Sequence, residues 1–369
     1  MKKSMKAVVA TVFALTSTFA MTSTAGASAP SVKNNDKCLK TQYGKSTKTG
    51  TKSFKCSFNS TTKKYTWKSV AAVATTVPVI DLTKLDKTGW PKKLIIGGVP
   101  AENVTTMQTK WDGLINLLKD ELGIPVEFYA GTSYAGVIEA SIAKKVDMVA
   151  WGAMSYIVSK LNGAKIEPIG ISKYIDGTTS YTSKLIVPAG SSIANIAGLK
   201  GKTVCFVSDT STSGGLIPTE GVLAAGLKMT DITRANKVTH DNSVLGLAAG
   251  QCEASFAQEA TIAALGTGAF AAMKPTDYKT IWESGPIPNG PFSISSLLPA
   301  SFRAAVKNIM YTKMNKEYFV SKGYNGCKDV ATCIIVEDKN TASFIKVEDA
   351  FYDTIRKVCE ATKSSACKA

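Results

Sequence analysis

The chain has 369 residues, a mass of 39.0 kDa and a mean hydropathy of +0.04, which is enough for two ordinary domains and excludes a peptide or a disordered tail. Its 44 Lys and Arg residues against 28 Asp and Glu residues give a formal charge of +16, so nucleic acid, an anionic envelope surface and an anionic ligand all have to be considered. A single histidine argues against most metal sites and most catalytic triads.

The first 29 residues have the pattern of a secretory signal peptide. Lysines at positions 2, 3 and 6 form a basic start, the stretch 7–20 is apolar but short for a bilayer, and small residues at 25–29 offer a cleavage site. No cysteine directly follows that site, and no later segment is apolar for long enough to span a membrane. We expect an exported protein, periplasmic or associated with the cell envelope; an uncleaved N-terminal anchor is the alternative.

The cysteines are interpreted as disulfide partners. Export permits disulfides, and the sequence has no Cys-x-x-Cys pair and too few histidines for a zinc site, so we expect no metal. The expected disulfides are Cys38–Cys56, Cys205–Cys252, Cys327–Cys333 and Cys359–Cys367. This pairing rests only on proximity in the sequence or in the expected fold, and other connectivities are formally possible.

Residues 30–68 predict a small basic module. Lys, Thr and Ser dominate, and aromatic residues from Phe54 to Trp67 alternate with polar ones, which is typical of a β-hairpin. The module either docks on an anionic envelope polymer or is a solvated spacer closed by one disulfide. Residues 69–90, which begin with an Ala/Val/Thr run, are predicted to be a linker.

From residue 91 onward, strands alternate with helices, which indicates an α/β protein with a mainly parallel sheet. We expect two lobes, with lobe 1 formed by 91–183 and 292–369 and lobe 2, formed by 184–291, inserted into it. The expected strands are 94–99, 125–129, 147–151, 185–187, 203–207 and 254–257. The expected helices are 105–122, 134–144, 214–226, 242–249, 299–318 and 341–360, with a Pro-rich return crossing at 281–295.

The most informative stretch is 207–218, Val-Ser-Asp-Thr-Ser-Thr-Ser-Gly-Gly-Leu-Ile-Pro. It leaves a buried strand and enters a helix, where open N–H groups and the positive end of the dipole favour an anion. The hydroxyls of Ser211, Thr212 and Ser213 add donors suited to a tetrahedral oxyanion. Simple N-capping would need one hydroxyl and would leave the other two and both glycines unexplained. We therefore predict an anion-binding turn, here called the cradle.

Three further residues are candidates for the same site. His240 lies just before the predicted helix 242–249, where an imidazole can donate to an anion. Tyr134 and Tyr181 fall where the first lobe would meet the cleft, and each offers a phenol donor and an apolar ring. Each of the three could instead be an ordinary capping or core residue.

These segments, in this order, resemble the phosphate/phosphite/phosphonate-binding solute receptors of ABC importers. The resemblance covers roughly 94–353 and is most specific in the Ser-Thr-Ser-Gly turn followed by Leu-Ile-Pro. It implies a two-lobed type II periplasmic-binding-protein fold with a hinge, a membrane permease as partner, no cofactor, and oxyanion contacts from the six candidates. The matching segments are 97–100, 133–140, 146–152, 211–218, His240 and 281–288.

The sequence departs from this pattern in one informative place. Receptors for aminoethylphosphonate carry an acidic residue in an Ile-Pro-x-x-Pro turn, whereas the turn here, 287–291, holds Asn289 and Gly290. Glu259 could still approach the cleft, and Asp209 could accept a ligand proton or cap its own turn. We expect a small ligand: phosphate, phosphite or methylphosphonate.

We predict a monomeric binding protein that is not an enzyme and does not bind nucleic acid. A serine hydrolase would need a base beside its nucleophile, and the Gly-x-Ser-x-Gly elbow is absent. The basic residues show no stacking platform or recognition-helix pattern. The alternative functions are an exported hydrolase and an envelope-binding protein that uses the basic N-terminal module.

Overall fold

A computed structural model describes residues 32–39, 46–49, 52–59, 64–70, 79–336 and 340–367. The expected signal peptide, 1–29, lies outside the described residues, as does the part of the expected linker at 71–78. The chain forms two compact units, Met1–Ala74 and Thr75–Ala369. Over the described ranges, no helix combines the length and the apolar character needed to cross a membrane.

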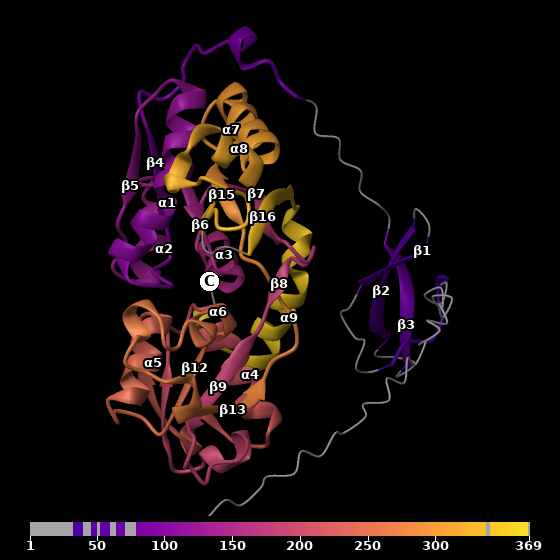
Figure 1. Ribbon diagram of the computed structural model, residues 1–369, viewed down its shortest axis with the longest axis vertical. Coiled ribbons are helices and arrows are strands. Elements are labelled where there is room, and N and C mark those ends of the chain that lie inside the picture. The colour runs from indigo at the N-terminus through magenta and orange to yellow at the C-terminus, as the bar shows by residue number, and fades with distance from the viewer. Residues whose placement is uncertain are drawn as a thin grey trace, which may run out of the picture. The chain divides into compact units, whose positions relative to one another are not determined.

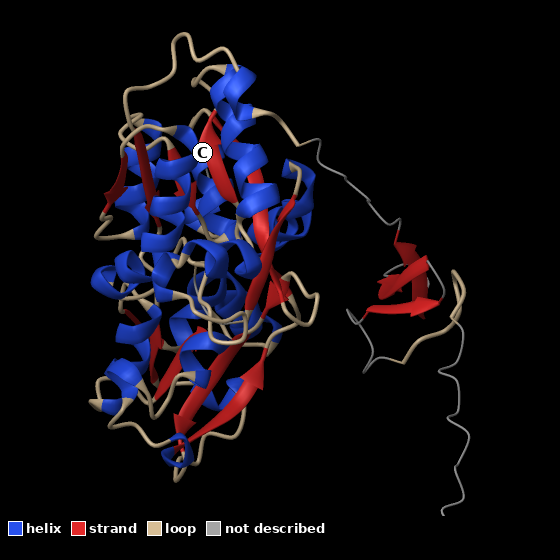
Figure 2. Ribbon diagram, turned by 45° about the horizontal axis from the view of Figure 1, so that its top comes forward, coloured by secondary structure: helices blue, strands red, loops and turns tan. Residues whose placement is uncertain are grey.

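The first unit is a three-stranded antiparallel sheet, where the sequence predicted a hairpin (Figure 2). Its strands, in spatial order, are β1 (Ser46–Thr49), β2 (Lys52–Asn59) and β3 (Lys64–Val70). Cys56 of β2 pairs in register with Trp67 of β3, and both are buried. This small aromatic cluster and one disulfide form the core of the unit.

The second unit contains two main sheets, which Figure 1 shows in separate lobes. The six-stranded sheet has the order β16-β7-β15-β6-β4-β5, and the five-stranded sheet has the order β11-β10-β12-β9-β13. The strands of the first are β4 (Leu94–Gly98), β5 (Val126–Tyr129), β6 (Met148–Ala150), β7 (Ile166–Tyr174), β15 (Phe292–Ser295) and β16 (Thr341–Lys346). Those of the second are β9 (Ser183–Pro188), β10 (Thr203–Phe206), β11 (Thr233–Asn236), β12 (Ala254–Gln258) and β13 (Tyr278–Glu283).

Both sheets are mixed, so the prediction of a mainly parallel sheet was wrong. β4 pairs in parallel with β5 and β6, and β10 pairs in parallel with β11 and β12, while the other pairs are antiparallel. The strands next to the crossings between the sheets, β7, β9, β13 and β15, all take part in antiparallel pairs, and so does β16 at the edge of the first sheet. A short pair, β8 (Ser180–Tyr181) with β14 (Ile287–Pro288), lies on these two crossings.

The helices cover the sheets with buried apolar residues. In α1, Asn103 caps the first turn by accepting from the Thr105 N–H, and Gly123 ends the helix in the left-handed conformation. The helices are α1 (Val104–Leu122), α2 (Tyr134–Ile142), α3 (Ala153–Leu161), α4 (Ile217–Ala224), α5 (His240–Ala248), α6 (Glu259–Ala263), α7 (Ala300–Lys313), α8 (Lys316–Lys322) and α9 (Asp353–Thr362).

Two predicted helices differ from the structure. The prediction of a helix over 341–360 was wrong, because its first part is the strand β16, paired with β7, and only the later part is helical in α9. The predicted helix 299–318 is broken near Asn315, whose side chain accepts from the Tyr318 N–H and begins α8. A new N-cap inside an apolar pattern therefore divides one predicted helix into two.

All four predicted cysteine pairs are confirmed as disulfides, and together they use all eight cysteines. Cys205–Cys252 ties β10 to the segment before β12. The bridges Cys327–Cys333 and Cys359–Cys367 close loops of six and eight positions near the end of the chain.

Candidate functional site

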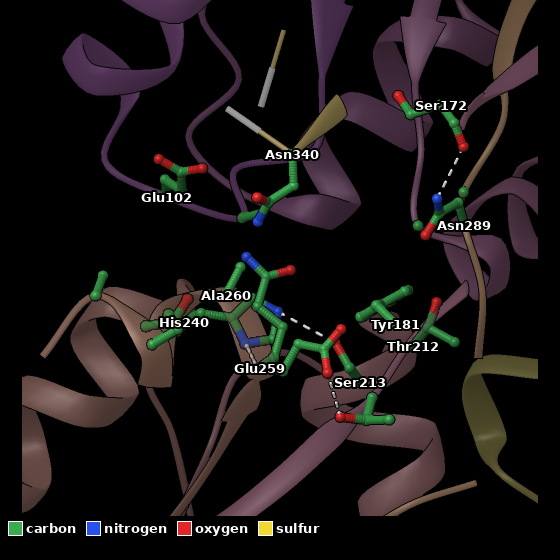
Figure 3. Close-up of a pocket in the computed structure, with 18 of the residues that line it drawn as sticks. Glu102, Ser172, Tyr181, Thr212, Ser213, His240, Glu259, Ala260, Asn289 and Asn340 are labelled. Atoms are coloured by element: carbon green, nitrogen blue, oxygen red, sulfur yellow. Dashed lines mark hydrogen bonds between the residues drawn. The ribbon is translucent and has the colours of Figure 1, made fainter. Parts of the chain in front are cut away.

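A cavity of about 1210 Å³ is lined by residues of both lobes. The six candidates predicted from the sequence all lie in its lining: Tyr134, Tyr181, Ser211, Thr212, Ser213 and His240. Figure 3 labels four of them, Tyr181, Thr212, Ser213 and His240. Tyr134 is the first residue of α2 in one lobe, and Tyr181 belongs to β8, on the crossing between the lobes. The other four belong to the second lobe. The structure therefore brings together residues that are up to 106 positions apart in sequence.

The cradle consists of Ser211, which is the N-cap, and a single π-helical turn, Thr212–Leu216, that leads into α4. Thr212 and Ser213 are the first two residues of this turn, so their backbone N–H groups have no acceptor within the helix. We call these two groups the open N–H groups. The turn also lies close to the preceding backbone, because a Cβ on Gly215 would stand 2.1 Å from the Ser208 carbonyl oxygen. Glycine is therefore required for the packing that holds the two open N–H groups at the cavity.

The hydroxyl oxygens of the cradle already act as acceptors. Ser211 Oγ accepts from the Gly214 N–H at 3.1 Å, and Thr212 Oγ1 accepts from the Met154 N–H at 2.9 Å. Since a hydroxyl carries one proton and its oxygen is engaged in accepting here, the proton remains to be donated elsewhere. N-capping thus explains Ser211 only in part, and both side chains can donate an O–H to an anion.

His240 is the first residue of α5 and is 2% exposed. Burial lowers its pKa to about 3, so the imidazole is neutral near pH 7. The Gln258 N–H donates to Nδ1 at 3.1 Å, which leaves the ring proton on Nε2. Nε2 lies 3.5 Å from Ser213 Oγ. The imidazole is therefore a neutral donor that points at the cradle.

The N-terminal end of α5 also joins the two lobes. The His240 N–H donates to the Ala101 carbonyl oxygen at 3.0 Å, and Asp241 Oδ2 accepts from the Asn103 N–H at 3.2 Å. Burial raises the pKa of the Asp241 carboxyl. With the bond from Met154 to Thr212, direct hydrogen bonds link the lobes at two places around the cavity. In this structure, therefore, the two lobes contact each other directly.

A family model matches residues 96–332, and its description is "ABC transporter, phosphonate, periplasmic substrate-binding protein". The chain belongs to this family. The predicted resemblance is therefore confirmed, and the protein is a substrate-binding component of the ABC-transporter class.

This phosphonate-binding family member is similar to two curated proteins. The phosphate-import protein PhnD of Mycolicibacterium smegmatis is 34% identical over 294 residues, covering 76% of this chain and 89% of that protein. The phosphonates-binding periplasmic protein of Escherichia coli is 28% identical over 207 residues, covering 54% of this chain and 60% of that protein.

The fold of this chain is similar to that of a solved structure. PhnD1 from Prochlorococcus marinus, in complex with methylphosphonate, matches with a TM-score of 0.64 at 19% identity, covering 74% of this chain and 99% of that chain. Together with the order of the two sheets, this confirms the α/β type II periplasmic-binding-protein fold, in which the second lobe is inserted into the first.

The lining of the receptor's cavity does not carry a positive charge excess, although the whole chain does. Lys110 forms an ion pair with Glu102 at 2.6 Å, and Lys184 lies 3.8 Å from Glu283. The acidic lining residues are Glu102, Asp176, Asp241 and Glu259, and the basic ones are Lys110 and Lys184. An anion in this cavity would therefore depend on neutral N–H and O–H donors rather than on net charge.

The structure gives different positions to Asp209 and Glu259, the two carboxylates whose roles the sequence did not decide. Asp209 forms an ion pair with Arg234 at 2.7 Å and is absent from the cavity lining, so it stabilises its own loop. Glu259 lines the cavity (Figure 3). Thr182 donates to Glu259 Oε2 at 2.8 Å, and the next residue, Ser183, donates to the Ser213 carbonyl oxygen at 2.6 Å. Consecutive residues therefore hold Glu259 and the cradle close together.

Asn289, in the turn 287–291, has a structural role. Its Nδ2 donates to the Ser172 carbonyl oxygen at 3.0 Å (Figure 3). Sequence reasoning missed Met154 and Gln258, which act on the site through backbone N–H groups. Any residue except proline supplies that group, so no side-chain pattern could have revealed them.

Proposed function

We propose that the cleft binds phosphate, phosphite or methylphosphonate and that the receptor delivers this ligand to the permease of an ABC importer. The observation that supports this most is the convergence of neutral donors on one small volume: open N–H groups, hydroxyl protons and the Nε2–H of a neutral imidazole. Fixed donors of this kind offset the cost of desolvating an oxyanion. The ligand contacts are Tyr134, Tyr181, Ser211, Thr212, Ser213 and His240.

We further propose that the bound ligand keeps one proton. Glu259 is a carboxylate in the lining, held near the cradle by the bonds of Thr182 and Ser183. An ionised carboxylate only accepts hydrogen bonds, so it favours a P–OH group and repels a fully ionised oxygen. Sulfate has no proton to donate at neutral pH, and this carboxylate therefore supports selection for phosphorus oxyanions.

The geometry of His240 supports binding without catalysis. A serine nucleophile needs a base whose free lone pair faces its hydroxyl. Here the Gln258 N–H occupies Nδ1, so Nε2 presents a proton to Ser213 rather than a lone pair. A pKa of about 3 also makes this imidazole a poor base near pH 7. Our proposal is accordingly an exported, periplasmic or envelope-associated monomeric receptor rather than a hydrolase, acting on a small anion rather than on nucleic acid.

Calorimetry with phosphate, phosphite, methylphosphonate, aminoethylphosphonate and sulfate tests the proposal. We expect binding of one or more of the first three and no heat with sulfate. Glu259→Gln should let sulfate bind, because the amide can donate where the carboxylate could not. Glu283→Gln is the matched control, since Glu283 also contacts Thr182 but does not line the cavity. No binding of any phosphorus oxyanion, or binding of sulfate to the unmodified protein, would contradict the proposal.

A further inference from the structure

The N-terminal unit has a charge distribution unlike the rest of the chain. Residues 31–70 contain ten lysines and one aspartate, with no arginine and no glutamate. The proposed transport function does not involve this unit, because the residues of the cleft all come from position 99 onward. The arrangement of these lysines on the sheet therefore calls for a separate explanation.

Three lysines gather around one threonine on the sheet. Lys37 bridges Thr66 in antiparallel register at the side of β3. Lys64 and Lys68 lie two positions before and after Thr66, so they share its face of the strand. Diagonal neighbours across a strand pair are about 7 to 8 Å apart. Lys37, Thr66, Lys64 and Lys68 are here called the lysine surface, and the side chains of its three lysines are exposed.

The charges of the lysine surface are not neutralised within the described part of the unit. The single carboxylate, that of Asp36, accepts from the Lys33 backbone N–H at 2.7 Å and so caps a turn. Lys68 Nζ donates to the neutral Asn35 Oδ1 at 2.7 Å. An anionic partner would therefore meet lysines that have no carboxylate partner among the described residues of the unit.

The opposite face of the sheet excludes one class of partner. Phe54, Cys56 and Trp67 are buried there as the core of the unit. Their burial leaves Thr66 and the lysines on the accessible face. Among the described residues of the unit, Leu39 alone is an exposed large apolar side chain, which is too little apolar surface for binding at a membrane. This face fits a hydrated, charged partner better than a lipid bilayer.

We propose that the lysine surface binds a flexible extracytoplasmic polymer with repeated anionic groups and so retains the receptor at the cell envelope. Lysine ammonium groups are compact point charges on flexible stems, whereas arginine is favoured for fixed bidentate recognition. A surface built from lysine alone therefore suits repeated, interchangeable contacts along a chain of negative charges. Binding of this kind releases counterions and depends steeply on salt.

The test uses the full-length exported chain and immobilised poly(glycerol phosphate) as the probe. We expect the triple variant Lys37→Gln, Lys64→Gln, Lys68→Gln to bind about tenfold or more weakly at 50 mM salt. The slope of log affinity against log salt should become shallower by about two, since each lost contact removes about 0.7. The same three positions changed to arginine should keep the binding, which separates loss of charge from loss of folding.

A matched triple variant, Lys145→Gln, Lys200→Gln, Lys274→Gln, removes the same charge from exposed positions of the second unit. We expect it to bind the polymer as the unmodified chain does, and we expect the same of the cleft variant Ser213→Ala. An equal loss in the matched triple variant would overturn the proposal in favour of bulk charge. Tighter binding to phosphatidylserine vesicles or to duplex DNA than to the polymer would also overturn it.

Discussion

The cleft and the lysine surface are both suited to anions, but for different physical reasons. In the cleft, donors are buried, neutral and fixed by hydrogen bonds, as with the His240 imidazole held by Gln258. On the lysine surface, the donors are exposed lysine side chains, and no carboxylate among the described residues pairs with them. Fixed dipoles select one small ligand by geometry, whereas exposed charges attract any polyanion and are screened by salt.

The largest expected effect distinguishes two serines of the cradle. Ser213→Ala should weaken ligand binding by about 1.5 to 3 kcal/mol, the usual loss for a hydrogen bond to a charged partner, with little change in stability. Ser211→Ala should weaken binding similarly and also lower the free energy of unfolding by about 1 kcal/mol, because Ser211 caps the π-helical turn. Calorimetry and denaturant unfolding measure the two quantities. Unchanged affinity in both variants would remove the cradle from the site.

The next effect concerns pH. In the unfolded chain His240 has its ordinary pKa of 6.5, whereas the folded protein keeps it neutral down to about 3. The unfolded state therefore binds an extra proton between these values, and stability falls as the pH drops through this window. The loss is about 1.4 kcal/mol per pH unit, or about 2 kcal/mol at pH 5.

Denaturant unfolding at pH 7 and pH 5 measures this loss. His240→Gln serves as the control, because it cannot titrate and should lose less stability over the same interval. His240 is the only histidine, so no other imidazole contributes to the difference. Equal losses in the two proteins would show that the imidazole is not held neutral by burial.

A smaller effect should follow from the contact between the lobes. Asp241→Ala removes the acceptor for the Asn103 N–H and should speed ligand release about fivefold, as expected for a loss of about 1 kcal/mol. Asp241→Asn keeps an oxygen in the same place and should release ligand nearly as slowly as the unmodified protein. Stopped-flow release measures both rates. Fast release from the Asn variant would indicate that the negative charge matters rather than the hydrogen bond.

The smallest effect is the sensitivity of the cleft to salt. Methylphosphonate affinity should change by about twofold at most between 50 and 200 mM sodium chloride, because buried interactions are weakly screened. Titration at the two salt concentrations measures it. A steep dependence would show that the cleft also relies on net charge, and would erase the contrast with the lysine surface.

The cradle and the alternation of strands and helices at the start of the first lobe could be predicted, because each depends on residues that are close together in the sequence. Ser211, Thr212 and Ser213 are adjacent, and glycines follow directly. The partners of Thr212 and His240 could not be predicted, because Met154 and Gln258 donate to them through backbone N–H groups from distant positions. The strand β16 was misjudged for another reason. A register shift between Thr341 and Ser343 leaves the buried residues Thr341 and Phe344 three positions apart, which is a helical spacing.

The pattern of covalent cross-links has a mechanical consequence. Each of the four disulfides joins positions no more than 47 residues apart, and the longest of them, Cys205–Cys252, begins and ends within the inserted lobe. No sulfur bridge therefore restrains the crossings that carry β8 and β14. The disulfides therefore stiffen each lobe internally and leave the relative motion of the two lobes free of any covalent restraint, so cross-linking stabilises the fold without opposing a hinge movement.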